Sequence, residues 1–195
     1  MTASPREEPI PEWFRPPRGG WRAEDLDRLP PEAPRHLELL HGDLIVNAAQ
    51  RSFHAHAVRT LHSALESQLP PGCHADSEMS VRIDTRNRPE PDILLVTSPP
   101  DPDRTYYDPW EVVLVGEVIS EESEERDREI KPLKYAQAGI RHFWIIDQDK
   151  GFRPTVTTFA LDRATGSYVR TGEYRDRLTV SEPYPLDIDF AAFDR

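Results

Sequence analysis

Glu117 is a carboxylate inside EVVLVGEVIS (111–120), a stretch whose β-branched and aliphatic residues are typical of a buried strand. Burying a carboxylate without a partner costs several kcal/mol, so such a group is usually paired or bound to a metal. A second carboxylate, Asp92, lies in PEPDILLV (89–96), where another strand should begin directly after a proline. If the two strands are neighbours, both carboxylates point into one cleft, and two hard oxygen ligands suit Mg²⁺ or Mn²⁺.

Lys131 follows Glu117 by fourteen residues, on a helix expected to pack back over the same sheet. Its ammonium could lie beside the two carboxylates, where it would orient a water or neutralise a phosphoryl oxygen. The chain has three lysines against twenty-one arginines, so Lys131 and Lys134, three residues apart, stand out. Unlike arginine, lysine can titrate when it is desolvated. Lys134 stays open as the rival for the same role.

Each of these residues also has a purely structural interpretation. Asp92 could be a strand-edge aspartate after a turn, Glu117 could pair with an arginine, and Lys131 could be a solvated helix residue. The histidines suggest a different metal site, because His54, His56 and His62 all lie on one predicted helix. At about 100° per residue, however, His54 and His56 point in nearly opposite directions, so the histidines cannot share one centre.

The elements that must position these side chains alternate between helix and strand. A short helix is expected over 23–29, and two strands around a turn at 41–43. An amphipathic helix follows over 52–69, with Ser52 as its N-cap. Strands are then expected at 78–84, 91–97, 111–120 and 142–147, a helix at 127–138 that Pro132 complicates, and a late antiparallel hairpin formed by 154–161 and 167–171. The strand–helix–strand unit over 111–147 should be a right-handed crossover between parallel strands, which predicts a mixed α/β fold.

Length and composition limit the possible functions. A chain of 195 residues fits one domain, which we place at 21–195, after a flexible, proline-rich arm over 1–20. The net charge of −11 argues against a protein that coats DNA broadly. The N-terminal sequence has no signal-peptide pattern, no apolar run is long enough to span a membrane, and Cys73 is the single cysteine. These features favour a cytoplasmic protein.

Four separated motifs resemble the Uma family of bacterial restriction-endonuclease-like proteins, which is assigned to the PD-(D/E)XK nuclease superfamily. They are LELLHGDLIV (37–46), the histidine in RSFHAH (51–56), PEPDILLV and GEVIS followed by DREIKPLKYAQAGIRHFWIID (127–147). The resemblance implies a restriction-endonuclease-like core, in which a central mixed β-sheet is flanked by helices. An extra C-terminal β-hairpin would be added to that core.

The resemblance also implies roles for individual residues. Asp92 matches the first acid of the superfamily motif and Glu117 the second. The superfamily lysine would normally fall at Ile119, and in the Uma pattern it has moved to the following helix, which makes Lys131 its match. Glu38 and the Val118 carbonyl would complete the metal shell, Asp127 would orient Lys131 from one helical turn away, and His54 would support the site.

The sequence therefore predicts a Mg²⁺- or Mn²⁺-dependent endonuclease that cuts DNA. A homodimer would supply the two active sites that cutting both strands usually needs. Two other functions stay open. One is a catalytically inactive nuclease fold that binds a partner, which the net charge of −11 would suit. The other is a metal-dependent hydrolase of small phosphate esters, for which an acidic surface is less of a handicap.

Overall fold

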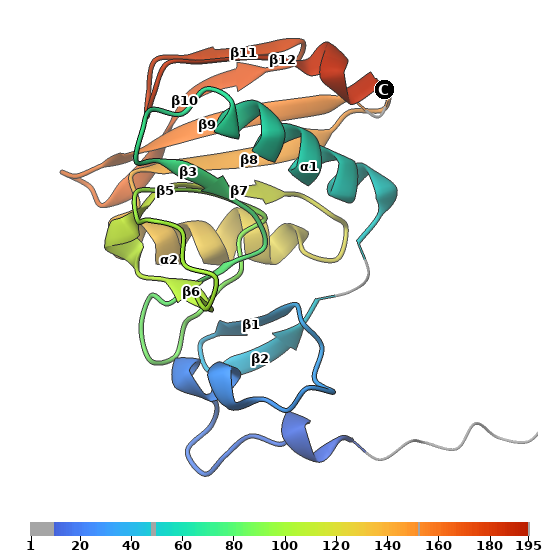
Figure 1. The fold of residues 1–195 in the computed structure, drawn as a ribbon, viewed down its shortest axis with the longest axis vertical. Helices are drawn as coiled ribbons and strands as arrows, with labels where there is room; N and C mark the ends of the chain where they lie inside the picture. The colour runs from blue at the N-terminus through green and yellow to red at the C-terminus, as the bar shows by residue number, and fades with distance from the viewer. Residues whose placement is uncertain (1–9, 48–49, 152, 195) are drawn as a thin grey trace, which may run out of the picture.

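The computed structural model describes residues 10–47, 50–151 and 153–194. A six-stranded sheet in the order β10-β9-β8-β7-β5-β3 forms its centre (Figure 1). Its strands are β3 (His74–Asp76), β5 (Ile93–Val96), β7 (Val112–Val118), β8 (His142–Gln148), β9 (Pro154–Asp162) and β10 (Ser167–Tyr174). β7 and β8 pair in parallel and the other neighbours pair antiparallel, so the predicted mixed sheet is confirmed.

Two helices cover opposite faces of this sheet. α1 (Ser52–Glu66) packs on the face that carries Leu114 and Trp144, and α2 (Lys131–Gln137) packs on the face that carries Val115. The apolar face of α1 buries Leu61 completely, as the prediction of an amphipathic helix implies. α2 lies in the connection between the parallel strands β7 and β8, which is the crossover that parallel pairing requires.

A smaller part of the molecule, built mainly from residues 10–46, lies at the opposite end from the C-terminal strands (Figure 1). It holds a two-stranded sheet whose turn has positive φ at His41 and Gly42, as the predicted hairpin requires. The buried Arg88 fastens this part to the rest, donating to the Ala23 carbonyl at 3.0 Å and to Asp27 at 2.8 Å. The elements of this smaller part are η1 (Glu12–Phe14), η2 (Ala23–Arg28), β1 (Leu37–Leu40) and β2 (Asp43–Val46).

The C-terminal hairpin predicted at 154–171 forms as β9 and β10, and these strands extend one side of the central sheet. A further antiparallel pair follows it, β11 (Arg177–Val180) and β12 (Leu186–Asp189), and then η5 (Phe190–Asp194). Phe190, at the start of η5, packs in the same core as α1. The described residues contain no helix long and apolar enough to cross a membrane.

Several local predictions were wrong. Ser52 is not an N-cap: Arg51 holds that position, without a side-chain hydrogen bond, and Ser52 is the first helical residue. The short helix expected over 23–29 forms, as the 3₁₀ helix η2. The strand over 78–84 shrinks to β4 (Ser80–Val81), which pairs outside the central sheet with β6 (Tyr106–Tyr107). Residues 1–9 of the predicted arm lie outside the described residues.

Candidate active site

Asp92 and Glu117 are brought together by the register of β5 against β7. Ile93 pairs with Gly116 in this antiparallel ladder, so continuing the register by one residue places Asp92 beside Glu117. The Val118 N–H donates to Asp92 Oδ2 at 2.6 Å, which fixes the aspartate against the end of β7. Glu117 points to the α2 face of the sheet and is 1% exposed. The two carboxylates therefore lie next to each other where the two strands meet, as predicted.

Lys131 reaches the same place from the first residue of α2. A π-turn, η4 (Arg126–Ile130), precedes it, and the Lys131 N–H donates to the Arg126 carbonyl, five residues back. Pro132 has no N–H for the next α-helical bond, which accounts for an irregular turn at this position. Such π-turns often occur at functional sites. The prediction of one helix over 127–138 is thus corrected to a π-turn followed by α2.

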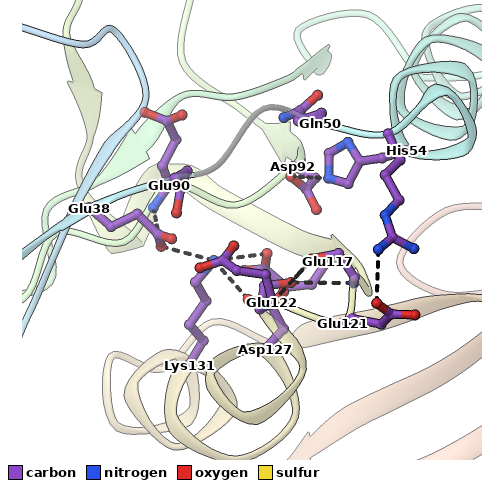
Figure 2. Close-up of a pocket in the computed structure, with 14 residues that line it drawn as sticks. Glu38, Gln50, His54, Glu90, Asp92, Glu117, Glu121, Glu122, Asp127 and Lys131 are labelled. Atoms are coloured by element: carbon purple, nitrogen blue, oxygen red, sulfur yellow. Dashed lines mark hydrogen bonds and ion pairs between the residues drawn. The ribbon is translucent and has the colours of Figure 1, made fainter. Parts of the chain in front are cut away.

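The Lys131 ammonium is surrounded by carboxylates (Figure 2). Its Nζ lies 2.9 Å from Glu38 Oε2, 3.1 Å from Glu117 Oε2 and 3.0 Å from Asp127 Oδ1, and the lysine is 3% exposed. Burial lowers the pKa of Lys131, but the surrounding carboxylates, Glu117 foremost, raise it well above its ordinary value. The lysine is therefore charged, and three side chains fix its position.

Negative charge exceeds positive charge around this lysine. Burial raises the pKa of Glu117 well above its ordinary value, although Lys131 opposes the shift, and burial likewise raises the pKa of Asp127. The buried Tyr135 hydroxyl donates to Glu117 Oε1 at 2.6 Å, which satisfies the second oxygen. Since Glu38 and Asp92 add two more carboxylates to the same cluster, one ammonium cannot balance the charge. Such a cluster favours either proton uptake or a bound cation.

His54 approaches Asp92 from the first turn of α1. Its Nε2 lies 3.0 Å from Asp92 Oδ1, and its buried Nδ1 has no hydrogen-bond partner among the described residues. Burial lowers the pKa of His54, but the hydrogen bond to Asp92 and the nearby carboxylates together outweigh burial, so the net shift is upward. His54 therefore lies beside the cleft, where the predicted supporting residue was expected. His56 and His62 bond instead to the Phe193 and Ala75 carbonyls.

A cleft of about 430 Å³ is lined by the predicted site residues Glu38, His54, Asp92, Glu117, Asp127 and Lys131. Glu117 lies on β7 and Asp92 directly before β5, whereas Lys131 and Asp127 belong to the η4–α2 segment. The remaining wall includes residues of β1, the start of α1 and the loop after β7 (Figure 2). The lining includes seven carboxylates and two permanently charged cations: Glu38, Glu90, Asp92, Glu117, Glu121, Glu122 and Asp127 against Arg51 and Lys131. Burial raises the pKa of Glu90 to about 7.

The donor set suits a small divalent cation. Within residues 10–47, 50–151 and 153–194, no three histidine, cysteine or acidic side chains converge in a ready-made metal cluster. Mg²⁺ does not need one, because it is usually bound through one or two carboxylates and keeps several waters. Asp92 and Glu117 supply two adjacent carboxylates, and each oxygen retains a free lone pair beside its present partner. The residues present therefore fit Mg²⁺ or Mn²⁺.

The predicted site residues are thus gathered in one place, and Lys134 does not line the cleft whereas Lys131 does. The lining or contacting residues that were missed include Arg51, Glu90 and Tyr135. Tyr135 is fully buried, and its hydroxyl donates a hydrogen bond to Glu117. The tyrosine falls four residues after Lys131, on the same helical face, and this spacing could have identified it.

Comparison with known proteins gives one family and one fold. The family model Uma2, described as a putative restriction endonuclease, matches residues 23–192. A solved structure similar to this chain is the crystal structure of a putative nuclease belonging to DUF820 from Anabaena variabilis ATCC 29413, at 1.96 Å resolution. The TM-score is 0.63 at 16% identity, covering 87% of this chain and 95% of the other, so this likeness shows a nuclease-like fold alone. No curated protein sequence matches significantly.

Proposed function

The chain belongs to the Uma2 family of putative restriction endonucleases, and we propose that it is a metal-dependent endonuclease of the PD-(D/E)XK type that hydrolyses phosphodiester bonds in DNA. The observation that carries this proposal is the meeting of Asp92, Glu117 and Lys131 in one cleft. Two adjacent carboxylates can hold a metal ion that activates water, and a fixed ammonium can stabilise the charge that develops on a phosphodiester. They come from separate elements, so their convergence is not a consequence of sequence proximity.

Asp92 and Glu117 would hold Mg²⁺ or Mn²⁺, with Glu38 and the Val118 carbonyl as further ligands. When bound, such a cation lowers the pKa of a coordinated water and stabilises the charge that develops on the phosphate. The protein's own contribution is to keep the carboxylates in place before the cation arrives. The Val118 N–H and His54 hold Asp92, and the Tyr135 hydroxyl holds Glu117.

Lys131 would orient the attacking water or neutralise a phosphoryl oxygen. Its contacts with Glu38 and Asp127 hold the ammonium without help from Glu117, so the lysine can stay in position when Glu117 turns to a cation. The superfamily position two residues after the glutamate is Ile119, whose half-buried side chain packs against the core on the α2 face. The helix thus provides the cation that the strand lacks.

Calorimetry with Mn²⁺ on wild type and Glu117→Ala, combined with plasmid cleavage on the same samples, tests the proposal. We expect saturable binding and metal-dependent nicking in wild type, and the loss of both in the variant. Lys131→Ala should keep metal binding and lose turnover. If wild type bound no metal at millimolar concentrations, it would be an inactive binding module, and the proposal would be overturned.

A hydrolase of small phosphate esters is the competing enzyme, and the carboxylate-rich cleft is the observation in its favour. Competition separates the two substrates: DNA should inhibit hydrolysis of a small phosphodiester if DNA is the substrate, and should have no effect otherwise. We further propose a cytoplasmic location, where such an enzyme meets DNA. Homodimerisation would bring two active sites to the two strands, and sedimentation with and without duplex DNA tests it.

A further inference from the structure

Arg51 lies at the mouth of the cleft, directly before the first residue of α1. Its guanidinium is 2.8 Å from Glu121, in the loop that follows β7, so this ion pair connects two walls of the cleft. The two side chains are 71% and 82% exposed. Ion pairs with this exposure contribute about 0–1 kcal/mol, so a better partner can displace Glu121 from Arg51 at little cost.

Arg51 is the accessible cation of a cleft in which carboxylates predominate. Of the two permanently charged cations that line it, Lys131 is 3% exposed and committed to three carboxylates. A phosphodiester that approaches this cleft meets repulsion from most of the lining. Among the described lining residues, Arg51 is the one that presents a permanent positive charge to solvent, and a planar guanidinium can bind a phosphate through two parallel hydrogen bonds.

The position of Arg51 along the chain places it close to the reacting groups. His54, which contacts Asp92, follows it by three residues on the first turn of α1. α1 begins at this point without a side-chain cap, so the partial positive charge of the helix N-terminus lies at the same rim. Figure 2 shows Glu121 and His54 at the same side of the cleft.

We infer that Arg51 is a DNA-binding residue of the cleft, an inference that rests on the proposed nuclease function. Glu121 pairs with Arg51 in the free protein, and Arg51 exchanges this partner for a backbone phosphate when DNA enters. The exchange replaces a weak, exposed ion pair by a bidentate contact with the substrate. Glu121 then acts as a competitor of DNA. The chain thereby obtains a specific phosphate contact although it is acidic overall, at −11.

The test is fluorescence anisotropy with a labelled DNA duplex, in Ca²⁺, which takes the same oxygen ligands as Mg²⁺. Arg51→Ala should weaken binding about tenfold and reduce the slope of log K against log salt concentration by about one. Glu121→Gln should tighten binding a few-fold, and this gain should disappear when it is combined with Arg51→Ala. That loss of the gain shows that Glu121 acts through Arg51 and not through its charge alone.

Two variants provide matched controls. Arg59→Ala is the control for Arg51→Ala, because it removes a positive charge from an exposed arginine two turns along α1, outside the cleft. Glu124→Gln is the control for Glu121→Gln, because it removes a negative charge from an exposed glutamate that pairs with Arg128. Both should bind DNA as wild type does. Equal affinities and salt slopes for Arg51→Ala and Arg59→Ala would overturn the inference while the nuclease proposal stands, provided that wild type cleaves. Wild type that neither binds nor cleaves DNA would overturn both.

Discussion

Lys131 on α2 lies 2.9 Å from Glu38 on β1, although β1 belongs to a two-stranded sheet separate from the central one. Glu38 also accepts a hydrogen bond from the Glu90 N–H at 3.2 Å. The carboxylate is 1% exposed, so it joins the small N-terminal sheet to the centre of the cleft. The candidate lysine is therefore positioned by two parts of the fold at once, and changes in either part should reach it.

Lys131→Met should be strongly destabilising in the absence of metal. The methionine fills a similar volume but leaves Glu38, Glu117 and Asp127 without a counter-charge, and unpairing a buried ion pair costs about 3–5 kcal/mol. Mg²⁺ should restore part of the loss, since a ligand that binds only the folded state stabilises it. Thermal unfolding in EDTA and in Mg²⁺ measures both effects. Lys134→Met is the control, and equal stability of the two variants would show that the cluster does not depend on Lys131.

Tyr135→Phe should affect the metal site as well as stability. It removes the hydroxyl that satisfies Glu117 Oε1 in a fully buried setting, which costs about 1–3 kcal/mol. Tyr168→Phe is a matched control, because its hydroxyl donates to the Ile140 carbonyl at 2.8 Å on the same face of the sheet and does not contact the cleft. Urea unfolding should show losses in both variants. Mn²⁺ calorimetry should show a changed affinity in Tyr135→Phe alone, and unchanged affinity there would limit Tyr135 to a structural role.

The carboxylates of the site could be predicted from sequence because they interrupt apolar strands. Asp92 and Glu117 are conspicuous in such surroundings, and the pairing of β5 with β7 brings them together as expected. The role of Arg51 could not be predicted, because a surface arginine before a helix has no distinctive pattern. Glu38 shows the same limit: alternation along a short strand leaves its direction open, and only the packing of β1 against Arg88 and α2 decides it.

The strand predicted over 78–84 shows why alternation can mislead. Met79, Val81 and Ile83 alternate as a half-buried strand would, yet Glu78 has a positive φ of 55°, and the Ile83 N–H donates to the Asn87 carbonyl in a tight turn. These local bonds compete with pairing into the central sheet. β3 (His74–Asp76) forms the edge of the central sheet instead, and a strand of three residues is too short to show alternation of apolar and polar side chains.

Glu90 should make the stability of the metal-free protein depend on pH. Burial raises the pKa of Glu90 to about 7, although the hydrogen bond to His36 opposes this shift. In the unfolded chain the Glu90 carboxyl has a pKa near 4.5. A folded pKa above the unfolded value gives a stabilising contribution that is complete below pH 4.5 and is lost as the pH rises through about 7. Glu90→Gln carries no such dependence.

The free energy of unfolding of wild type minus that of Glu90→Gln should therefore fall by on the order of 2–3 kcal/mol between pH 4.5 and pH 8. Urea unfolding in EDTA at a series of pH values measures this difference, and EDTA prevents a bound cation from stabilising the carboxylates. A difference that is constant over the whole range would mean that the Glu90 carboxyl titrates alike in the folded and unfolded chains.

Gly42→Ala should disturb the site from a distance, through the sheet that carries Glu38. Gly42 has φ +85°, and an added Cβ would lie 2.2 Å from the Arg86 guanidinium, which donates to the Gly19 and Trp21 carbonyls. Gly72→Ala is the control, since Gly72 has φ +86° but nothing within 4 Å of the added Cβ.

Both variants should lose about 1–2 kcal/mol to backbone strain, and Gly42→Ala should lose about 1–3 kcal/mol more because Arg86 must move. This additional loss of stability in Gly42→Ala should be accompanied by weaker Mn²⁺ binding, because β1 and β2 then hold Glu38 less firmly against Lys131. Denaturant unfolding and calorimetry on both variants separate the two effects. If Gly42→Ala loses no more stability than Gly72→Ala, Arg86 yields freely and the small sheet does not constrain the site.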